Sequence, residues 1–199
     1  MEPLLQFLSW ATRRESDEGL TPSITNMKAQ KLSYLAESLY GHLENRDLSD
    51  GTFQAWDHGP AQPDLYRFIK SRVGDSPAAP LEPFSTGDAI PRDVEEIFDG
   101  IWENFGGMTA TQLRNFTHTY GPYEHHYRVG VRGITIPKNE IHDAWPDFIN
   151  GLHVFERSPE MRRRVDALKT LPPHIDAYST DGLNKELIHS IFAGHATER

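Results

Sequence analysis

The 199-residue sequence contains no cysteine. This absence excludes disulfide bonds, thiolate-bound zinc and cysteine nucleophiles from any account of the fold or the chemistry. It also fits a reducing compartment, so we expect a cytoplasmic protein. Long apolar runs are missing as well. No apolar stretch approaches the ~20 residues that a membrane-spanning helix needs. We therefore expect no membrane partner.

Basic residues are scarce. Lysine and arginine number 20 against 29 aspartate and glutamate residues, which gives a formal net charge of −9. Nucleic-acid binding needs a basic footprint that neutralises phosphates, so a nucleic acid is disfavoured as the main partner. The acidic balance is common among cytosolic proteins, and it also favours a basic protein partner that is steered by complementary charge.

The motifs of several enzyme classes are absent. The sequence has no G-x-S-x-G nucleophile turn, no Walker loop, no G-x-G-x-x-G fingerprint and no H-E-x-x-H zinc motif. The densest cluster among ten histidines is His118, His125 and His126. Adjacent side chains diverge on a helix or a strand, so neighbouring imidazoles do not easily face one ion. We expect no catalytic residue, metal or cofactor, and a small histidine-dependent metal hydrolase is the less favoured alternative.

The spacing of apolar residues predicts a mainly helical protein. In residues 94–105 the apolar side chains recur at i, i+3, i+4, i+7, i+8 and i+11, which forms one stripe that must be buried. Thr25 is a suitable N-cap for another helix, and Thr109 begins a capping-box pattern with Gln112. Lys31 lies beside the apolar stripe of the helix after Thr25, and we expect its ammonium to reach solvent.

Two segments do not follow the helical spacing. Residues 53–56 are expected to be extended and to end at the turn-forming pair Gly59 and Pro60. Residues 129–136 alternate valine and isoleucine around two glycines, which indicates a short strand or hairpin. The predicted fold class is therefore mainly α, a compact single-domain helical bundle with room for one short β-hairpin.

Three blocks of sequence carry a resemblance when they are taken in order. The first is ITNMKAQKLSYLAESLY at residues 24–40, and the second is FQAWDHGPAQPDLYRFIK at residues 53–70. The third is IWENFGGMTATQLRNFTHTYGPY at residues 101–123. Together they resemble the signatures of the Panacea domain, the SocA-like antitoxin family. The resemblance covers roughly residues 2–155.

The resemblance implies a mainly helical antitoxin in which residues 1–155 form a Panacea-like helical domain. It further implies that the protein neutralises a cognate protein toxin, encoded by the adjacent gene, by direct binding. One relative acts instead as an adaptor that hands its toxin to a protease, so delivery to a protease is the alternative. No catalytic residues come with the family. Residues 156–199 lie outside the resemblance, and we expect a C-terminal helical extension that packs on the domain or binds the partner.

The candidate partner-binding residues are those of the second and third blocks. We expect the aromatic residues of the second block to anchor an extended segment against the helix that follows Thr25. Tryptophan and tyrosine are common interface anchors, so an exposed edge of this scaffold is expected to serve binding. His58 and His118 are expected to form a polar spot through hydrogen bonds rather than proton transfer. The full set is Phe53, Trp56, His58, Gly59, Pro60, Tyr66, His118 and Tyr123.

Overall fold

The computed structural model describes residues 2–87 and 89–157. The chain divides into two compact units, Met1–Ile149 and Asn150–Arg199. The C-terminal extension expected from the sequence, residues 156–199, lies outside the described residues except for its first two positions. Within the described ranges, no helix is long and apolar enough to cross a membrane.

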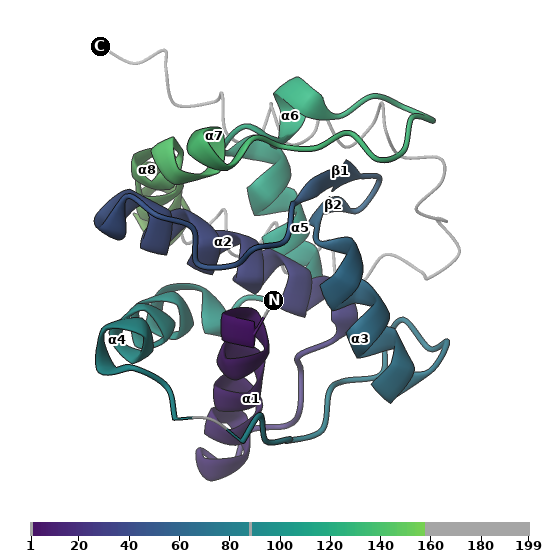
Figure 1. Ribbon diagram of the computed structural model, residues 1–199, viewed down its shortest axis with the longest axis vertical. Coiled ribbons are helices and arrows are strands. Elements are labelled where there is room, and N and C mark those ends of the chain that lie inside the picture. Colours follow the sequence, from purple (N-terminus) through teal and green to yellow (C-terminus); the bar gives the residue numbers. More distant parts are fainter. Residues whose placement is uncertain (1, 88, 158–199) are drawn as a thin grey trace. The chain divides into compact units, whose positions relative to one another are not determined.

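The described chain is built mainly of helices, as the apolar spacing predicts (Figure 1). The helices are α1 (Glu2–Asp17), α2 (Asn26–Glu44), α3 (Pro63–Val73), α4 (Arg92–Ile101), α5 (Ala110–Thr119), α6 (Tyr123–His126), α7 (Lys138–Asp143) and α8 (Trp145–Arg157). A five-residue π-helical turn, η1 (Trp102–Gly106), continues α4. Two short strands, β1 (Gln54–Trp56) and β2 (Gly59–Ala61), complete the fold.

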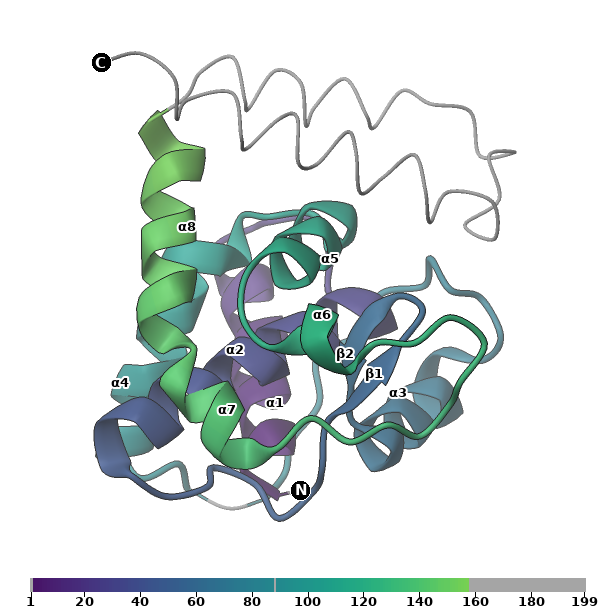
Figure 2. The ribbon, with the colours of Figure 1, turned by 90° about the horizontal axis from the view of Figure 1, so that it is seen from above.

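α2 is the central helix, and it packs against α1, α3, α4, α5, α7 and β2 (Figure 2). Every residue from Lys28 to Gly41 is buried. A helix that is buried all round has no solvent face for its polar residues. This stretch nevertheless carries Lys28, Gln30, Lys31 and Glu37. Each of these polar groups therefore needs a partner inside the protein.

The helix starts that the sequence predicts are confirmed. The Thr25 side chain accepts a hydrogen bond from the backbone N–H of Lys28 at 3.3 Å, and Thr109 forms a reciprocal capping box with Gln112. The apolar stripe of residues 94–105 is buried along its length. It is divided between α4 and η1, because the last turn of this helix is π-helical.

β1 and β2 form an antiparallel hairpin in which Ala55 pairs with Pro60 and Trp56 pairs with Gly59. The sequence predicts that Gly59 and Pro60 end the extended segment. That prediction is wrong, because the chain already reverses at residues 57–58 and the glycine–proline pair forms the returning strand. Gly59 has a φ of 94°, a backbone conformation that favours glycine.

The hairpin lies earlier in the chain than the alternation of residues 129–136 suggests. Those residues contribute a single bridge, between Thr135 and Gln54. Two backbone hydrogen bonds, of 2.9 and 2.8 Å, flank this bridge and join Ile134 and Ile136 to the β1 segment. The end of the stretch therefore runs beside β1, and its glycine-rich start forms the loop between α6 and α7 that Figure 2 shows beside the hairpin.

Candidate partner-binding site

The aromatic residues of the second sequence block hold the hairpin to two different helices. Phe53 is completely buried, and its ring meets the ring of Tyr34 edge-on with centroids 5.3 Å apart. Trp56 is half-buried, and its indole N–H donates to Gln54 Oε1 at 2.9 Å. The Trp56 ring meets the ring of Tyr66 edge-on at 5.2 Å. Phe53 therefore packs on α2, whereas Trp56 packs on α3.

A column of stacked rings supports the hairpin turn. The hydroxyl of Tyr123 donates to the backbone carbonyl of Trp56 at 2.7 Å. The Tyr123 ring stacks on His118, with centroids 4.2 Å apart, and on Tyr127 at 5.4 Å. The Tyr127 hydroxyl donates in turn to Asp57 Oδ1 at 2.9 Å. The third sequence block thus fixes the position of the second.

Lys31 lies directly beneath Gly59 and Pro60. Its side chain is 1% exposed, and its ammonium donates to the Pro60 carbonyl at 3.1 Å. A Cβ added to Gly59 would lie 2.7 Å from Cε of Lys31 and 3.1 Å from Nε2 of His118. Burial, together with the positive charge of Arg114, lowers the pKa of Lys31 to about 7. The prediction that Lys31 reaches solvent is therefore wrong, because the hairpin covers its ammonium.

Lys28, one turn earlier on α2, is also buried but has more polar partners. Its ammonium donates to Ser23 Oγ and to the Gly106 carbonyl, both at 2.7 Å. The carboxylate of Glu15 lies 4.0 Å away. Burial still lowers the pKa of Lys28. This lysine joins α2 to the segments on either side of it and is a structural group.

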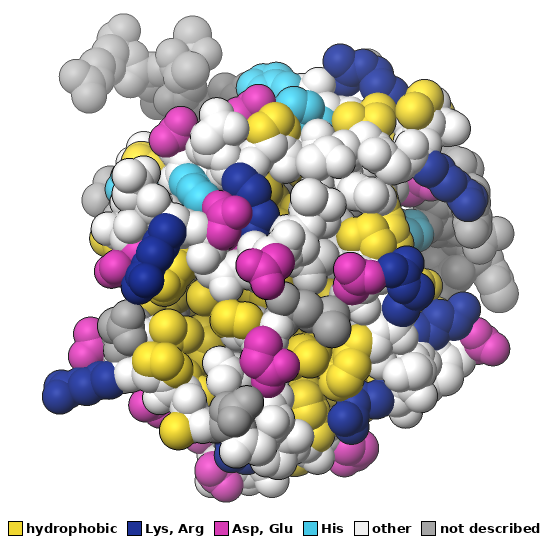
Figure 3. Space-filling model, viewed as in Figure 1, with side chains coloured by type: hydrophobic (Ala, Val, Ile, Leu, Met, Phe, Trp, Pro, Cys, Tyr) yellow, Lys and Arg dark blue, Asp and Glu magenta, His cyan; other side chains and the backbone are white. Residues whose placement is uncertain are grey.

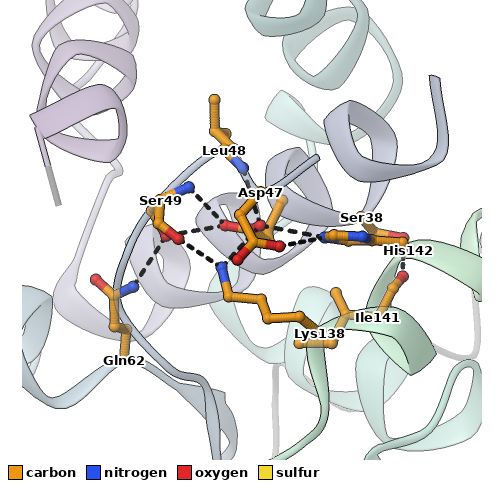
Figure 4. A network of polar contacts seen from close by, with 9 residues as sticks. Ser38, Asp47, Leu48, Ser49, Gln62, Lys138, Ile141 and His142 are labelled. Carbon is orange, nitrogen blue, oxygen red and sulfur yellow. Dashed lines mark hydrogen bonds and ion pairs between the residues drawn. The ribbon is translucent and has the colours of Figure 1, made fainter. Parts of the chain in front are cut away.

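A second polar network surrounds the carboxylate of Glu37, which is completely buried (Figure 4). Its oxygens accept hydrogen bonds from the backbone N–H groups of Leu48 at 3.0 Å and Ser49 at 3.1 Å, and from the Ser49 hydroxyl at 2.9 Å. The ammonium of Lys138 lies 2.8 Å away and the imidazole of His142 lies 3.3 Å away. The network joins α2 to the loop that follows it and to α7.

Gln62, the residue after β2, connects this network to the hairpin. Its side-chain N–H donates to the Ser49 hydroxyl at 3.2 Å, and its backbone N–H donates to Gln30 Oε1 at 2.8 Å. The polar residues buried on α2 therefore bind groups outside that helix. Their hydrogen bonds fix the hairpin and its neighbours in place, which is a scaffold role.

One trio in the described ranges has the geometry of metal ligands. The ligand atoms of Glu37, Asp47 and His142 lie within 4.8 Å of one another. Lys138 argues against an ion at this place, because its ammonium already neutralises the buried carboxylate and would repel a cation. No sequence motif points to this trio, since Glu37 and His142 are 105 residues apart.

The histidine cluster that the sequence singles out does not converge in the described part of the chain. His118 stacks on Tyr123, His126 Nε2 lies 2.7 Å from Glu140 Oε2, and His125 is exposed. A zinc site needs three or four ligands that face one point. Among the described residues, these three histidines do not form such a set.

Comparison with known proteins finds one family whose model matches the middle of the chain. The family described as "Antitoxin SocA-like, Panacea domain" matches residues 30–124. Residues 30–124 are therefore similar to the SocA-like Panacea domain. The matched segment contains all eight candidate partner-binding residues, and Lys31 and Glu37 as well. The resemblance drawn from the three sequence blocks is confirmed.

One curated relative is Antitoxin SocA of Caulobacter vibrioides (strain NA1000 / CB15N), which is 27% identical over 106 residues. The alignment covers 49% of this chain and 56% of the relative, so the chain spans about half the length of the curated relative it matches. No solved structure matches the chain.

Proposed function

We propose that this protein is an antitoxin that neutralises a cognate protein toxin, encoded by the adjacent gene, by binding it directly. The match of residues 30–124 to the SocA-like Panacea family carries the proposal. The proposed place of action is the cytoplasm, in line with a sequence that has no cysteine.

The way the protein uses its buried polar groups supports a binding role. The ammonium of Lys31, the carboxylate of Glu37 and the hydroxyl of Tyr123 each bind another part of the scaffold. A catalytic group must instead be free to reach a reacting atom of the substrate. We therefore propose that the protein acts without catalysis of its own.

The surface proposed to bind the toxin lies around the hairpin turn. His58 is exposed there, and Trp56 and Tyr66 are half-buried. Aromatic side chains that are already held in place lose little conformational freedom on binding. Among the other signature residues, Gly59 and Pro60 form the returning strand. Phe53 precedes β1, and the side chains of His118 and Tyr123 stack on one another beside the turn. Stable neutralisation requires an interface of roughly 1,600 Å², so the toxin must also cover elements beside the turn.

Co-expression in bacteria tests the proposal. The adjacent gene is expressed alone and then together with this protein, and growth is measured in both cases. We expect the adjacent gene to stop growth alone, growth to return on co-expression, and the two proteins to elute together in gel filtration. An adjacent gene that is harmless alone, with no complex in gel filtration, would contradict the proposal.

The lifetime of the toxin in cells separates direct occlusion from the protease-adaptor alternative. Direct occlusion predicts that the toxin persists in an inactive complex when this protein is present. An adaptor predicts that the toxin disappears faster. A pulse-chase measurement with and without this protein gives the answer, and a shortened toxin lifetime would replace occlusion with delivery.

A further inference from the structure

The loop between α6 and α7 exposes two large apolar side chains close together in the chain. Val129 is 73% exposed and Val131 is 51% exposed. Within the described residues, only Leu20 and Leu43 are comparably exposed large hydrophobics, and each lies in a different segment. Single exposed apolar residues are ordinary, whereas a cluster on one loop is typical of a contact surface.

The same loop has the opposite charge to the protein as a whole. The loop itself, residues 127–137, contains Arg128 and Arg132 and no acidic residue, in a chain with 29 aspartates and glutamates. Both arginines are exposed. Figure 3 shows hydrophobic and Lys or Arg side chains next to one another over this loop, at the upper right of the view. Both charged side chains of the loop itself are therefore positive, beside the exposed Asp57 of the hairpin turn, although the net charge of the protein is −9.

The loop is held at both ends on the hairpin. At its start the Tyr127 hydroxyl donates to Asp57 in the hairpin turn, and at its end the Ile134 carbonyl accepts from the backbone N–H of Ala55 at 2.9 Å. Arg128 Nη1 also donates to the backbone carbonyl of Tyr127 at 2.7 Å and to that of His125 at 2.9 Å. A loop anchored in this way loses less conformational entropy when it binds than a free one does.

We propose that the α6–α7 loop is the part of this protein that inserts into the cognate toxin, and that the toxin offers it an apolar pocket rimmed by carboxylates. The inference rests on the proposed function and adds the contacting element and the chemistry of the partner surface. Val129 and Val131 fill the pocket, and Arg132 pairs with the acidic rim. Overall net charge favours a basic partner, but the charge at the point of contact decides which surface docks there.

A nucleic acid fits these features less well than a protein does. Two exposed arginines neutralise few phosphates, and the net charge of −9 repels a polyanion. The exposed valines between the two arginines make no favourable contact with a phosphate backbone. They are suited to an apolar pocket of a protein. A complex that forms with nucleic acid and not with the toxin is accordingly one outcome that would overturn the proposal.

The test uses the full-length protein, the toxin and two loop variants. The first variant is Val129→Ser with Val131→Ser, and the second is Arg132→Glu; Arg128 stays in place because it supports the loop. Matched controls are Leu43→Ser, at a residue that is 59% exposed, and Arg92→Glu, on a side chain that is 92% exposed. Circular dichroism checks that each variant folds, and calorimetry measures the Kd for the toxin.

We expect each loop variant to raise the Kd about tenfold or more, and each control to change it less than about twofold. The effect of Arg132→Glu should shrink as salt is raised, because screening weakens the charge pairing. If the wild-type protein binds no toxin, the proposed function itself fails. If the wild-type protein binds and the folded loop variants bind equally well, the proposed function stands and the loop inference is wrong.

Discussion

The ammonium of Lys31 donates a hydrogen bond to the carbonyl oxygen of Pro60 at 3.1 Å. The bond joins the central helix to the strand that returns from the hairpin turn, and the lysine is 1% exposed. The hairpin therefore covers a buried amine. The shape of the candidate binding surface depends on a polar contact that no partner can reach.

The burial of Lys31 makes the stability of the protein depend on pH. The folded protein has a Lys31 pKa of about 7, against an ordinary value of 10.5. Between these two values the unfolded chain holds a proton that the folded protein lacks, so stability rises with pH across this window. Below about pH 7 both states are protonated, and the cost of burying the charge is fully present. Lys31→Met removes this dependence.

Urea unfolding of the wild-type protein and of Lys31→Met between pH 6 and 10 measures the effect. The wild-type protein should gain stability relative to the variant by about 1.4 kcal/mol per pH unit above pH 7. Arg114, whose charge contributes to the shift, stays protonated over this whole range. Two curves that run parallel over the whole range would show that Lys31 keeps its charge.

Gly59→Ala tests the close contact between the hairpin and α2. The new Cβ would lie 2.7 Å from Lys31 Cε at a residue with a φ of 94°. Gly19→Ala is the control, because Gly19 also has a positive φ, of 67°, but has open space around it. We expect Gly59→Ala to cost about 1–3 kcal/mol more than the control in urea unfolding. Equal losses of stability for the two variants would mean that the Lys31 side chain moves aside without strain.

Tyr123→Phe tests the column of rings beneath the turn. The substitution removes the hydrogen bond to the Trp56 carbonyl, which is 2.7 Å long. Because Tyr123 is 2% exposed, we expect a loss of about 1–2 kcal/mol of stability. Tyr127→Phe is the control, since its bond to Asp57 is exposed, and it should cost less than about 0.5 kcal/mol. The reverse order of costs would contradict the support assigned to Tyr123.

Glu37→Gln tests the scaffold role of the second network. The variant leaves the Lys138 ammonium without its buried counter-charge, 2.8 Å away, so we expect a loss of about 3–5 kcal/mol. Asp47→Asn is the control, because the Asp47 side chain is 52% exposed, and it should cost less than about 1 kcal/mol. If the trio is a metal site instead, zinc should raise the Tm of the wild-type protein, and Asp47→Asn should abolish that rise.

The helical architecture is predictable because its signals are local. The N-caps at Thr25 and Thr109 and the apolar stripe of residues 94–105 lie within a few turns of the helices they specify. The burial of Lys31 is not local. Sequence places it beside an apolar stripe, where a lysine usually reaches solvent. Only the contact with a strand 29 residues later covers it.

The residues around the hairpin can also be grouped from the sequence, but through the family resemblance. The resemblance of three blocks brings Trp56, Tyr66 and Tyr123 into one set, and the structure places them around one hairpin. The network of Glu37 and His142 is missed, because its members are 105 residues apart and share no motif. Polar groups paired over such distances become visible only when the chain is folded.

Calorimetric titration of the purified protein with the purified product of the adjacent gene tests the central claim most directly. The account predicts a stable complex with a Kd of about 1 μM or tighter, and Trp56→Ala should weaken it while the fold is retained. The account is contradicted if no complex forms at tens of micromolar while co-expression still restores growth, because neutralisation would then proceed without contact between the two proteins.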